Sequence, residues 1–286
     1  MQLEGYSVAR GCELARISRA GFYRQWEEKA PRQLETALRD AMQRIALANR
    51  CYGYRRVTAA LQLEGWEANH KRIARMLRED NLLSLRRPAF AVTTDSRHGY
   101  TIYPNLARNM VLITPNQLWV ADITYIRLAD AFVYLAVILD AFSRRVIGWE
   151  LGPGLTSSLV LSALRQALSS RTPSGDIVHH SDRGVQYCSG EYVKLLEAHG
   201  FTISMSRRGN PWDNAKCESF MKTLKAEEVY LKQYRDIEDA RANLMVFLDQ
   251  VYNRQRLHSA LHYQSPEAFE LALASPSPVT ATEANL

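Results

Sequence analysis

The stretch that decides the fold runs from Gln117 to Leu151 and reads QLWVADITYIRLADAFVYLAVILDAFSRRVIGWEL. It is rich in β-branched and aromatic residues, and short polar segments divide it, which is typical of strands joined by tight turns. We therefore predict three antiparallel strands, at residues 118–127, 132–139 and 145–151. Asp122 falls inside the first apolar run, where an unpaired buried acid would cost several kcal/mol. This acid is therefore a candidate for chemistry.

Helices and strands alternate downstream of this stretch. The predicted order is a helix at 157–169, a strand at 176–180, a helix at 189–199, a strand at 201–205, a helix from about 215, and helices at 236–253 and 265–274. Three strands followed by alternating helices and strands predict an α/β fold. The expected architecture is a ribonuclease-H-like mixed five-stranded sheet with flanking helices.

The chain before Gln117 reads as helical and basic. Residues 7–26 predict two short helices, a partial helix-turn-helix, and residues 34–48 predict an amphipathic helix. Residues 52–80, YGYRRVTAALQLEGWEANHKRIARMLRED, predict a short helix, a turn and a second helix capped by Asn69. The second helix carries Lys71, Arg72, Arg75 and Arg78. A turn followed by a basic helix favours an element that reads a DNA groove, and a solvated basic face is the alternative left open.

Composition and charge indicate two units. The chain has 286 residues, more than a usual single domain, and its 47% hydrophobic residues are typical of a globular protein. Residues 1–110 hold 19 Lys and Arg against 11 Asp and Glu, a balance of +8, and the rest holds 17 against 19, a balance of −2. That asymmetry favours a polyanion-binding module joined to a second unit. The predicted organisation is a helical N-terminal segment (1–30), a basic helix-turn-helix region (31–85), a linker (86–114), a ribonuclease-H-like α/β domain (115–274) and a disordered tail (275–286).

The sequence predicts neither export nor a membrane span. No apolar run reaches the roughly 18 residues that cross a bilayer, and the first residues lack the apolar core of a signal peptide. The four cysteines form no C-x-x-C pair, so a structural zinc site or a disulfide framework has little support. We expect a cytoplasmic protein with no membrane partner.

Two further acids stand where an open sheet places its ligands. Asp182 follows the predicted strand at 176–180, and Glu218 lies at the start of a later helix. Between them lie 35 residues. Because the chain contains 12 Asp and 18 Glu, about 0.8 pairs at this spacing are expected by chance. The flanking residues must therefore carry the specificity.

Those flanking residues resemble the bacterial insertion-sequence-three family of transposases. Four blocks carry the resemblance: LWVADITYI (118–126), HSDRGVQY (180–187), SMSRRGNPWDNAKCESFMKTLKAE (204–227) and YNRQRLHSALHYQSPEAF (252–269). The segment at 52–80 is similar to the basic helix-turn-helix of that family, and the likeness runs from about Ser7 to Phe269. It implies the product of the element's second reading frame, a DNA transposase with a D–D–35–E core of the kind found in retroviral integrases.

The resemblance also implies roles for individual residues. Asp122, Asp182 and Glu218 would be the catalytic carboxylates and would hold two Mg2+ ions, which Mn2+ can replace. Asp122 would bridge the two ions, and each of the other acids would hold one. The candidate DNA contacts are Arg55, Arg56, Lys71, Arg72, Arg75, Arg207, Arg208, Trp212, Lys222 and Lys225.

Partners follow from the same resemblance. Double-stranded DNA is expected, both as terminal inverted repeats and as target. Further copies of the chain in a dimer or larger assembly and a first-frame protein are expected as well. Two other functions stay open: a DNA-binding regulator without catalysis, and a ribonuclease-H-like nuclease.

Several residues have a structural interpretation beside the functional one. Asp140 is a rival third carboxylate, but it follows a strand at a turn and is predicted to be structural. His179, His180 and His258 lack a Cys or a further His spaced for zinc, so they are expected to orient neighbours or touch phosphate.

Residues near the start of the helix that carries Glu218 also have both a structural and a functional interpretation. Lys222 lies one turn after Glu218, so the two could form a simple solvated ion pair. Trp119 and Trp212 are either core aromatics or residues that stack on a terminal base, and Cys217 has no predicted role.

Overall fold

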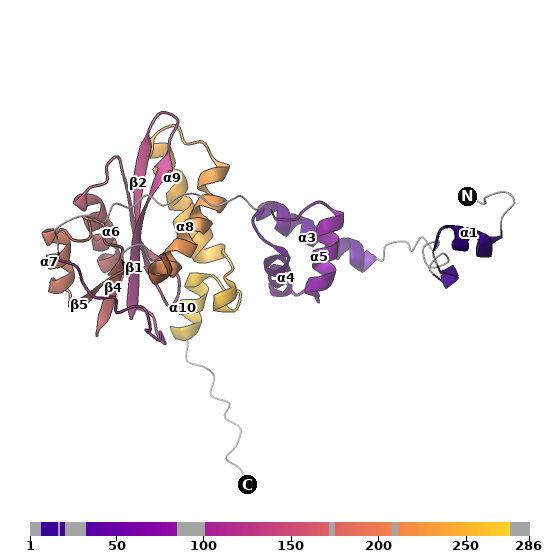
Figure 1. Cartoon of the computed structure of the whole chain (residues 1–286), viewed down its shortest axis with the longest axis horizontal. Coiled ribbons are helices and arrows are strands. Elements are labelled where there is room, and N and C mark those ends of the chain that lie inside the picture. Colours follow the sequence, from indigo (N-terminus) through magenta and orange to yellow (C-terminus); the bar gives the residue numbers. More distant parts are fainter. Residues whose placement is uncertain are drawn as a thin grey trace, which may run out of the picture.

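The computed structural model describes residues 7–16, 18–20, 33–84, 101–171, 175–207 and 211–274, with only the backbone at 33–34 and 211–212. Several predictions concern residues outside these ranges: the second short helix before residue 26 for the most part, most of the linker, the tail at 275–286, Arg208, and the side chain of Trp212. The first described helix is α1 (Val8–Leu14), near the amino terminus in Figure 1.

The sheet has five strands in the order β3-β2-β1-β4-β5. Their bounds are β1 (Leu118–Arg127), β2 (Phe132–Asp140), β3 (Val146–Gly152), β4 (Ile177–Ser181) and β5 (Phe201–Met205). The first three strands are antiparallel, as the short turns between them require, whereas β4 and β5 run parallel to β1 after helical crossovers. The predicted ribonuclease-H-like mixed sheet is confirmed.

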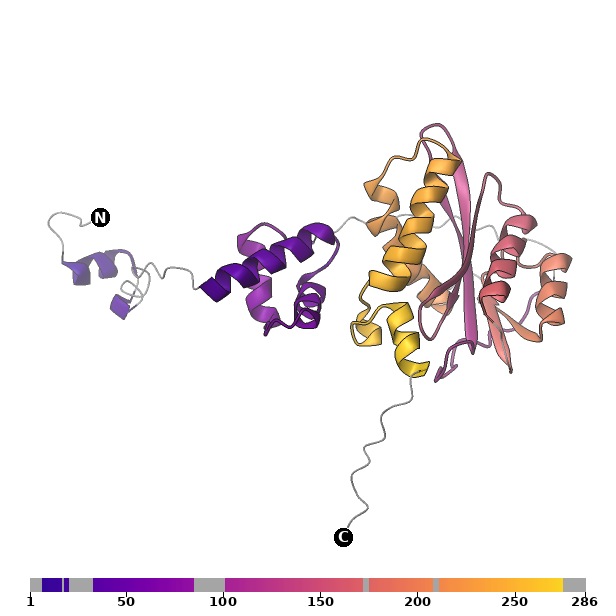
Figure 2. The same cartoon turned by 180° about the vertical axis from the view of Figure 1, so that it is seen from behind.

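Helices cover both faces of the sheet (Figures 1 and 2). One face carries α6 (Ser157–Ser170) and α7 (Gly190–Ala198). The other carries α8 (Ala215–Glu227), α9 (Ile237–Met245) and the π-helical segment η3 (Val246–Gln255), and α10 (Pro266–Ala274) packs on η3. The helix predicted at 236–253 is present but changes type, because the α-helix ends at Met245 and continues with π-helical turns to Gln255.

Alternation of side chains along β1 divides the core in two. Leu118 and Val120 pack with residues of α8, α9 and η3, whereas Trp119 and Ala121 pack with residues of α6 and α7. Successive strand side chains point to opposite faces, so Asp122 belongs to the face that α8 covers. The pleat of one strand therefore directs the first candidate acid toward the helix that carries Glu218.

A separate helical unit precedes the sheet. Its helices are α3 (Gln33–Ala48), α4 (Tyr54–Leu63) and α5 (His70–Glu79), and their apolar sides form one core. Asn69 caps α5 as predicted, since its side chain accepts a hydrogen bond from the Lys71 N–H. None of the described helices combines the length and apolar character that crossing a membrane requires.

The helical unit contacts the sheet domain through the segment after η3. Leu257 is buried in the core of the helical unit, and its N–H donates a hydrogen bond of 3.0 Å to the Tyr52 hydroxyl. The Cys51 thiol lies 3.6 Å from the carbonyl oxygen of Ala226, near the end of α8. A residue about 200 positions downstream thus completes the core of the first unit.

Candidate active site

Asp122 lies in the middle of β1, opposite Val137 of β2. Its side chain is half-buried, and its Oδ1 accepts a hydrogen bond of 2.9 Å from the Ile123 N–H. Among the described residues, this neighbouring amide is the one hydrogen-bond donor to the carboxylate, so its second oxygen is available for another interaction. The position fits a catalytic acid placed on a rigid central strand.

Asp182 comes directly after β4 and lies beside Asp122 through the strand register. Val120 pairs with His180 in the parallel ladder, so extending that register by two residues places Asp182 next to Asp122. Its Oδ1 accepts a hydrogen bond of 2.9 Å from the Gly184 N–H. A Cβ at Gly184 would lie only 3.0 Å from that oxygen, so glycine lets the loop fold closely around the carboxylate.

Glu218 lies in the first turn of α8, and Asn214 fixes the start of this helix to the sheet. The Asn214 side-chain amide donates a hydrogen bond of 3.1 Å to the Ala121 carbonyl, one residue before Asp122. Cys217, the neighbour of Glu218, is fully buried in the core. Because Cys217 packs into the core, the next residue, Glu218, lies at the border between the buried and the exposed face of the helix, with its side chain about one-third exposed.

Electrostatics connect the three acids. Burial raises the pKa of Asp122, and together with the negative charges of Asp182 and then Glu218 it brings this pKa to about 7. The pKa of the buried Cys217 thiol is raised by burial and by the same three carboxylates. The structure therefore brings the three predicted acids into one electrostatic neighbourhood. Within the described ranges, however, no group of three His, Cys, Asp or Glu side chains is arranged to hold a metal ion.

Two lysines of α8 lie beside these acids. The Lys222 Nζ is 3.6 Å from Glu218 Oε2, so the simple ion pair that the sequence left open does form. Lys225 is half-buried, with its Nζ 4.7 Å from the centre of the Tyr125 ring, and burial lowers its pKa while Asp122 acts in the opposite direction. The charge of Asp122 therefore interacts with the Lys225 ammonium group.

A second basic group surrounds the loop after β4. A cavity of about 510 Å³ is lined by Arg108, Arg183 and Arg207 together with Tyr103 and Asn105. Of these three arginines only Arg207 was a predicted DNA contact, and its guanidinium forms two 3.0 Å hydrogen bonds with Asp213. Arg183 was not predicted as a DNA contact, although its position directly after Asp182 in the sequence could have indicated it.

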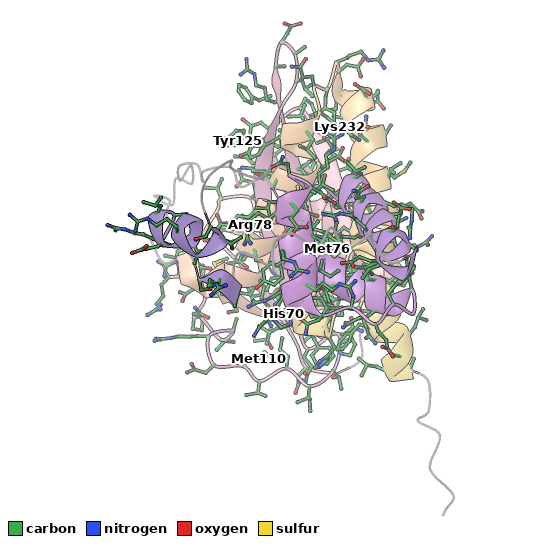
Figure 3. The ribbon with its side chains drawn as sticks, turned by 90° about the vertical axis from the view of Figure 1, so that its right-hand side faces the viewer. His70, Met76, Arg78, Met110, Tyr125 and Lys232 are labelled. Atoms are coloured by element: carbon green, nitrogen blue, oxygen red, sulfur yellow. The ribbon has the colours of Figure 1, made fainter. Side chains whose placement is uncertain are left out.

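The basic residues of α5 largely face solvent. Lys71, Arg75 and Arg78 are exposed and Arg72 is half-buried, while His70 and Arg78 lie toward opposite ends of the helix (Figure 3). Arg72 is 3.4 Å from Glu35, and Arg75 is 3.6 Å from Glu79. Such exposed pairs contribute about 0–1 kcal/mol, so they do not prevent either arginine from binding a phosphate.

Arg55 and Arg56 differ in their surroundings although they are adjacent in α4. Arg55 is exposed, with its guanidinium near the Tyr54 ring. Arg56 is half-buried, lies over the Tyr52 ring and faces the sheet domain. The two predicted DNA contacts therefore belong to different surfaces.

The remaining candidates have structural roles. Asp140 is fully buried, and its carboxylate accepts hydrogen bonds from the N–H groups of Asn116, Phe142 and Ser143. Trp119 is a core aromatic, packed against Phe201 and bonded through its indole N–H to the Asn116 side chain.

The two histidines of β4 are buried and neutral. His180 bonds through its two ring nitrogens to the hydroxyls of Ser204 and Ser206, and burial lowers its pKa to about 4. His179 bonds to the Tyr192 hydroxyl, and burial lowers its pKa to about 3. Both orient neighbouring residues, as the sequence indicated.

Comparison with known families and proteins yields consistent matches. An "Integrase core domain" model matches residues 114–211, a second model of the same description matches 199–266, and an "HTH-like domain" model matches 33–90. The insertion element IS600 31 kDa protein of Shigella sonnei is 36% identical over 263 residues, which cover 90% of this chain and 96% of that protein. Transposase InsF for insertion sequence IS3A of Escherichia coli K12 is 34% identical over 271 residues, covering 93% of this chain and 94% of that protein.

Solved structures also show similarity. A chain of the simian T-cell lymphotropic virus intasome aligns with a TM-score of 0.49 and 18% identity, covering 80% of this chain and 74% of that chain. The catalytic core domain of BIV integrase aligns with a TM-score of 0.42 and 20% identity, covering 56% of this chain and 96% of that chain.

Proposed function

Because the chain belongs to the insertion-sequence-three family of transposases, we propose that it cuts DNA at the ends of an insertion sequence and joins the freed 3′-hydroxyl to a second phosphodiester. The observation that carries this proposal is the electrostatic coupling of Asp122, Asp182 and Glu218. These acids come from a central strand, the end of its parallel neighbour and the start of a helix.

The chemistry of the three carboxylates fits divalent cations. Carboxylate oxygens are the ligands that Mg2+ and Mn2+ prefer, and a cation near Asp122 would offset the burial and the neighbouring negative charges that raise its pKa to about 7. Asp122, whose pKa responds to both other acids, would hold such ions together with Asp182 and Glu218. A bound pair of such ions would supply an activated oxygen nucleophile and a stabilised leaving oxygen.

The chain's own residues would position the DNA. Lys222 and Lys225 extend from Glu218 along α8, and Arg183 and Arg207 line the cavity beside Asp182. Phosphate oxygens accept charge-assisted hydrogen bonds from such groups, which holds a strand without reading its sequence. The Asn214 bond to Ala121 would keep α8, and with it Glu218, at a fixed distance from β1.

DNA recognition is assigned to the helical unit. We propose that residues 31–85 bind the terminal inverted repeats of the element through α5, and that residues 115–274 form the catalytic domain on the far side of a linker at 86–114. The HTH-like match over 33–90 and the exposed Lys71, Arg75 and Arg78 support this division. Two DNA ends must be joined in one event, so the working form would be a dimer or a larger assembly, with a first-frame protein as a possible partner.

Substitution of each carboxylate tests the proposed reaction. We expect Asp122→Asn, Asp182→Asn and Glu218→Gln each to lower cleavage and joining of labelled element ends in Mg2+ by at least about 100-fold, because the charge that holds the cation is removed. Gel-shift affinity for the same ends should stay close to that of the unchanged protein.

Asp130→Asn is the matched control. Asp130 is an exposed carboxylate in the turn between β1 and β2, and its replacement should leave joining unchanged. Near-normal joining by any one of the three carboxylate variants would remove that residue from the site. Activity without any divalent cation would refute metal-dependent strand transfer as a whole.

A further inference from the structure

A second, smaller cavity lies on the other side of α8, where the helical unit meets the sheet domain. Its volume is about 140 Å³. We call it the junction cavity and define it by Arg56 of α4, Arg144 after β2, Lys216 of α8, and Arg256 and His258 after η3. None of these residues belongs to the carboxylate site, and no function described above uses them together.

The junction cavity has more positive than negative charge. Arg256 is buried and forms hydrogen bonds of 2.7 and 2.8 Å with Glu227, so that pair is neutral. Arg56, Arg144 and Lys216 form no ion pair with any carboxylate of the described residues, and Asp140 is the one acid that lines the cavity. A surplus of two positive charges therefore remains.

The positive groups of the junction cavity lie close together and partly buried, which is unfavourable without an anion. Arg56 and Arg144 are both half-buried, and burial followed by the charge of Arg256 lowers the pKa of Arg56. Burial, Arg256, Arg144 and Arg56 together lower the pKa of His258 far below its ordinary value. Like charges that approach one another in a partly dry space cost free energy unless a counter-charge joins them.

The polar groups of the cavity suit one kind of anion. Guanidinium groups bind phosphate through paired hydrogen bonds, and the hydroxyls of Ser219 and Ser259 line the same space. Asp140 keeps its negative charge and is bound by three backbone N–H groups, so it reduces the positive surplus to two but does not cancel it. The volume admits a single tetrahedral oxyanion but no nucleoside.

We propose that the junction cavity binds one phosphate group, which links Arg56 of the helical unit to Arg144 and Lys216 of the sheet domain. The group is either a free phosphate ion or one phosphodiester of bound DNA. In both cases it would fasten the helical unit to the back of α8, the helix whose other side presents Glu218. Arg56 is then a connector between the two units instead of a contact on the exposed face of α4.

A phosphate titration of the full chain tests the shared chemistry. We expect the Tm to rise by about 2–5 °C more in sodium phosphate than in sodium chloride of equal ionic strength. Arg56→Gln and Lys216→Gln should lose most of this difference, whereas Arg56→Lys should keep part of it. Phosphate also stabilises folded proteins by exclusion from their surfaces, so the decisive quantity is the gap between the unchanged protein and each variant.

Arg50→Gln is the control for charge alone. Arg50 is exposed in the turn after α3 and does not line the cavity, so this variant should respond to phosphate as the unchanged protein does. Lys216 lies at the exposed rim, and its variant should fold even if Arg56→Gln weakens the contact between the units.

The salt dependence of DNA binding separates the two sources of phosphate. If the group belongs to DNA, the slope of log affinity against log salt should fall by about one unit in Arg56→Gln and return in Arg56→Lys. If Arg56→Gln loses the phosphate-dependent rise in Tm but keeps the salt slope of the unchanged protein, the bound group is free phosphate. If the variants match the unchanged protein in both measurements, the proposal is wrong. The titration needs neither DNA nor a divalent cation, so its failure would leave the proposed strand transfer intact.

Discussion

At the scale of single residues, Asp122 shows how position creates reactivity. An ordinary aspartate has a pKa near 3.8, whereas burial on β1 and the fields of Asp182 and Glu218 raise this pKa to about 7. The same arrangement that would attract a cation therefore makes the ionised form of Asp122 costly in the metal-free protein. Function and stability oppose each other at this residue.

The pH dependence of stability follows from that pKa. The folded-state pKa of about 7 lies above the unfolded value of 3.8, so the contribution of Asp122 to stability is complete below pH 4 and is lost as the pH rises through 7. Asp122→Asn should therefore stabilise the metal-free protein at pH 8 by about 1–3 kcal/mol, and much less at pH 4.5.

Urea unfolding in EDTA at the two pH values measures this difference. Asp130→Asn, at an exposed turn, should show no such change between the two conditions. An equal effect of Asp122→Asn at pH 4.5 and pH 8 would show that the pKa of Asp122 is not raised. The affinity for Mn2+ should rise through the same pH range, because only the ionised carboxylate binds the ion.

The sequence predicted the three acids but not the surroundings of the basic residues. Asp122 could be predicted as a candidate catalytic acid because it interrupts an apolar strand, and Asp182 because it follows the end of the next parallel strand. Nothing in the dipeptide Arg55–Arg56 shows that one faces solvent and the other faces a different unit, since that depends on Leu257 and its neighbours about 200 residues away. Local pattern carries local information only.

At the scale of elements, β3 and α6 approach each other unusually closely. A Cβ at Gly148 of β3 would lie 2.8 Å from the Ala167 nitrogen and closer still to the Ala163 carbonyl oxygen. Both obstacles are helix backbone, which cannot move without shifting all of α6. Gly148 therefore sets the distance between the sheet and the helix.

Gly148→Ala should lower the free energy of unfolding by about 1–3 kcal/mol, since the extra methyl forces the helix away from the sheet. Urea unfolding followed by circular dichroism measures the decrease. Gly190→Ala is the control, because nothing lies within 4 Å of a Cβ at the first position of α7. A variant at Gly148 as stable as the control would mean that α6 adjusts freely.

Elements with strong periodicity were predictable within one or two residues. The strands at 118–127 and 201–205 coincide with β1 and β5, because β-branched runs bounded by turns leave few alternatives. The π-helical turns of η3 were not predictable, because their apolar spacing resembles that of an ordinary helix. What holds them is tertiary: Asn253 bonds to both the N–H and the carbonyl of Val146 on β3.

At the scale of the whole molecule, positive and negative charges are distributed unequally between the two units. The first 110 residues carry the positive excess, and α5 presents it on an exposed helix. The sheet domain concentrates acids at one site and surrounds them with lysines and arginines. Under the proposed function, the helical unit would attract DNA broadly and the sheet domain would bind individual phosphates.

Removal of the α5 arginines should weaken DNA binding in a salt-dependent way. Arg72→Ala together with Arg75→Ala should reduce affinity for element ends and lower the slope against log salt by about one unit for each phosphate that is no longer bound. Fluorescence anisotropy over a salt series gives this slope. Arg235→Ala removes an exposed arginine from the sheet domain and should leave it unchanged; an unchanged slope in the α5 variant would place the DNA-reading surface elsewhere.

The burial of Leu257 among α3, α4 and α5 has a consequence for how the protein is made. The ribosome releases the amino-terminal helices long before residue 257 is synthesised. A nascent or prematurely terminated chain therefore lacks the Leu257 side chain that covers one side of that apolar cluster, and it lacks the Leu257 N–H that bonds to the Tyr52 hydroxyl. We expect such fragments to be loose and readily degraded. A cell would then contain few shortened copies able to occupy element ends and block the complete enzyme.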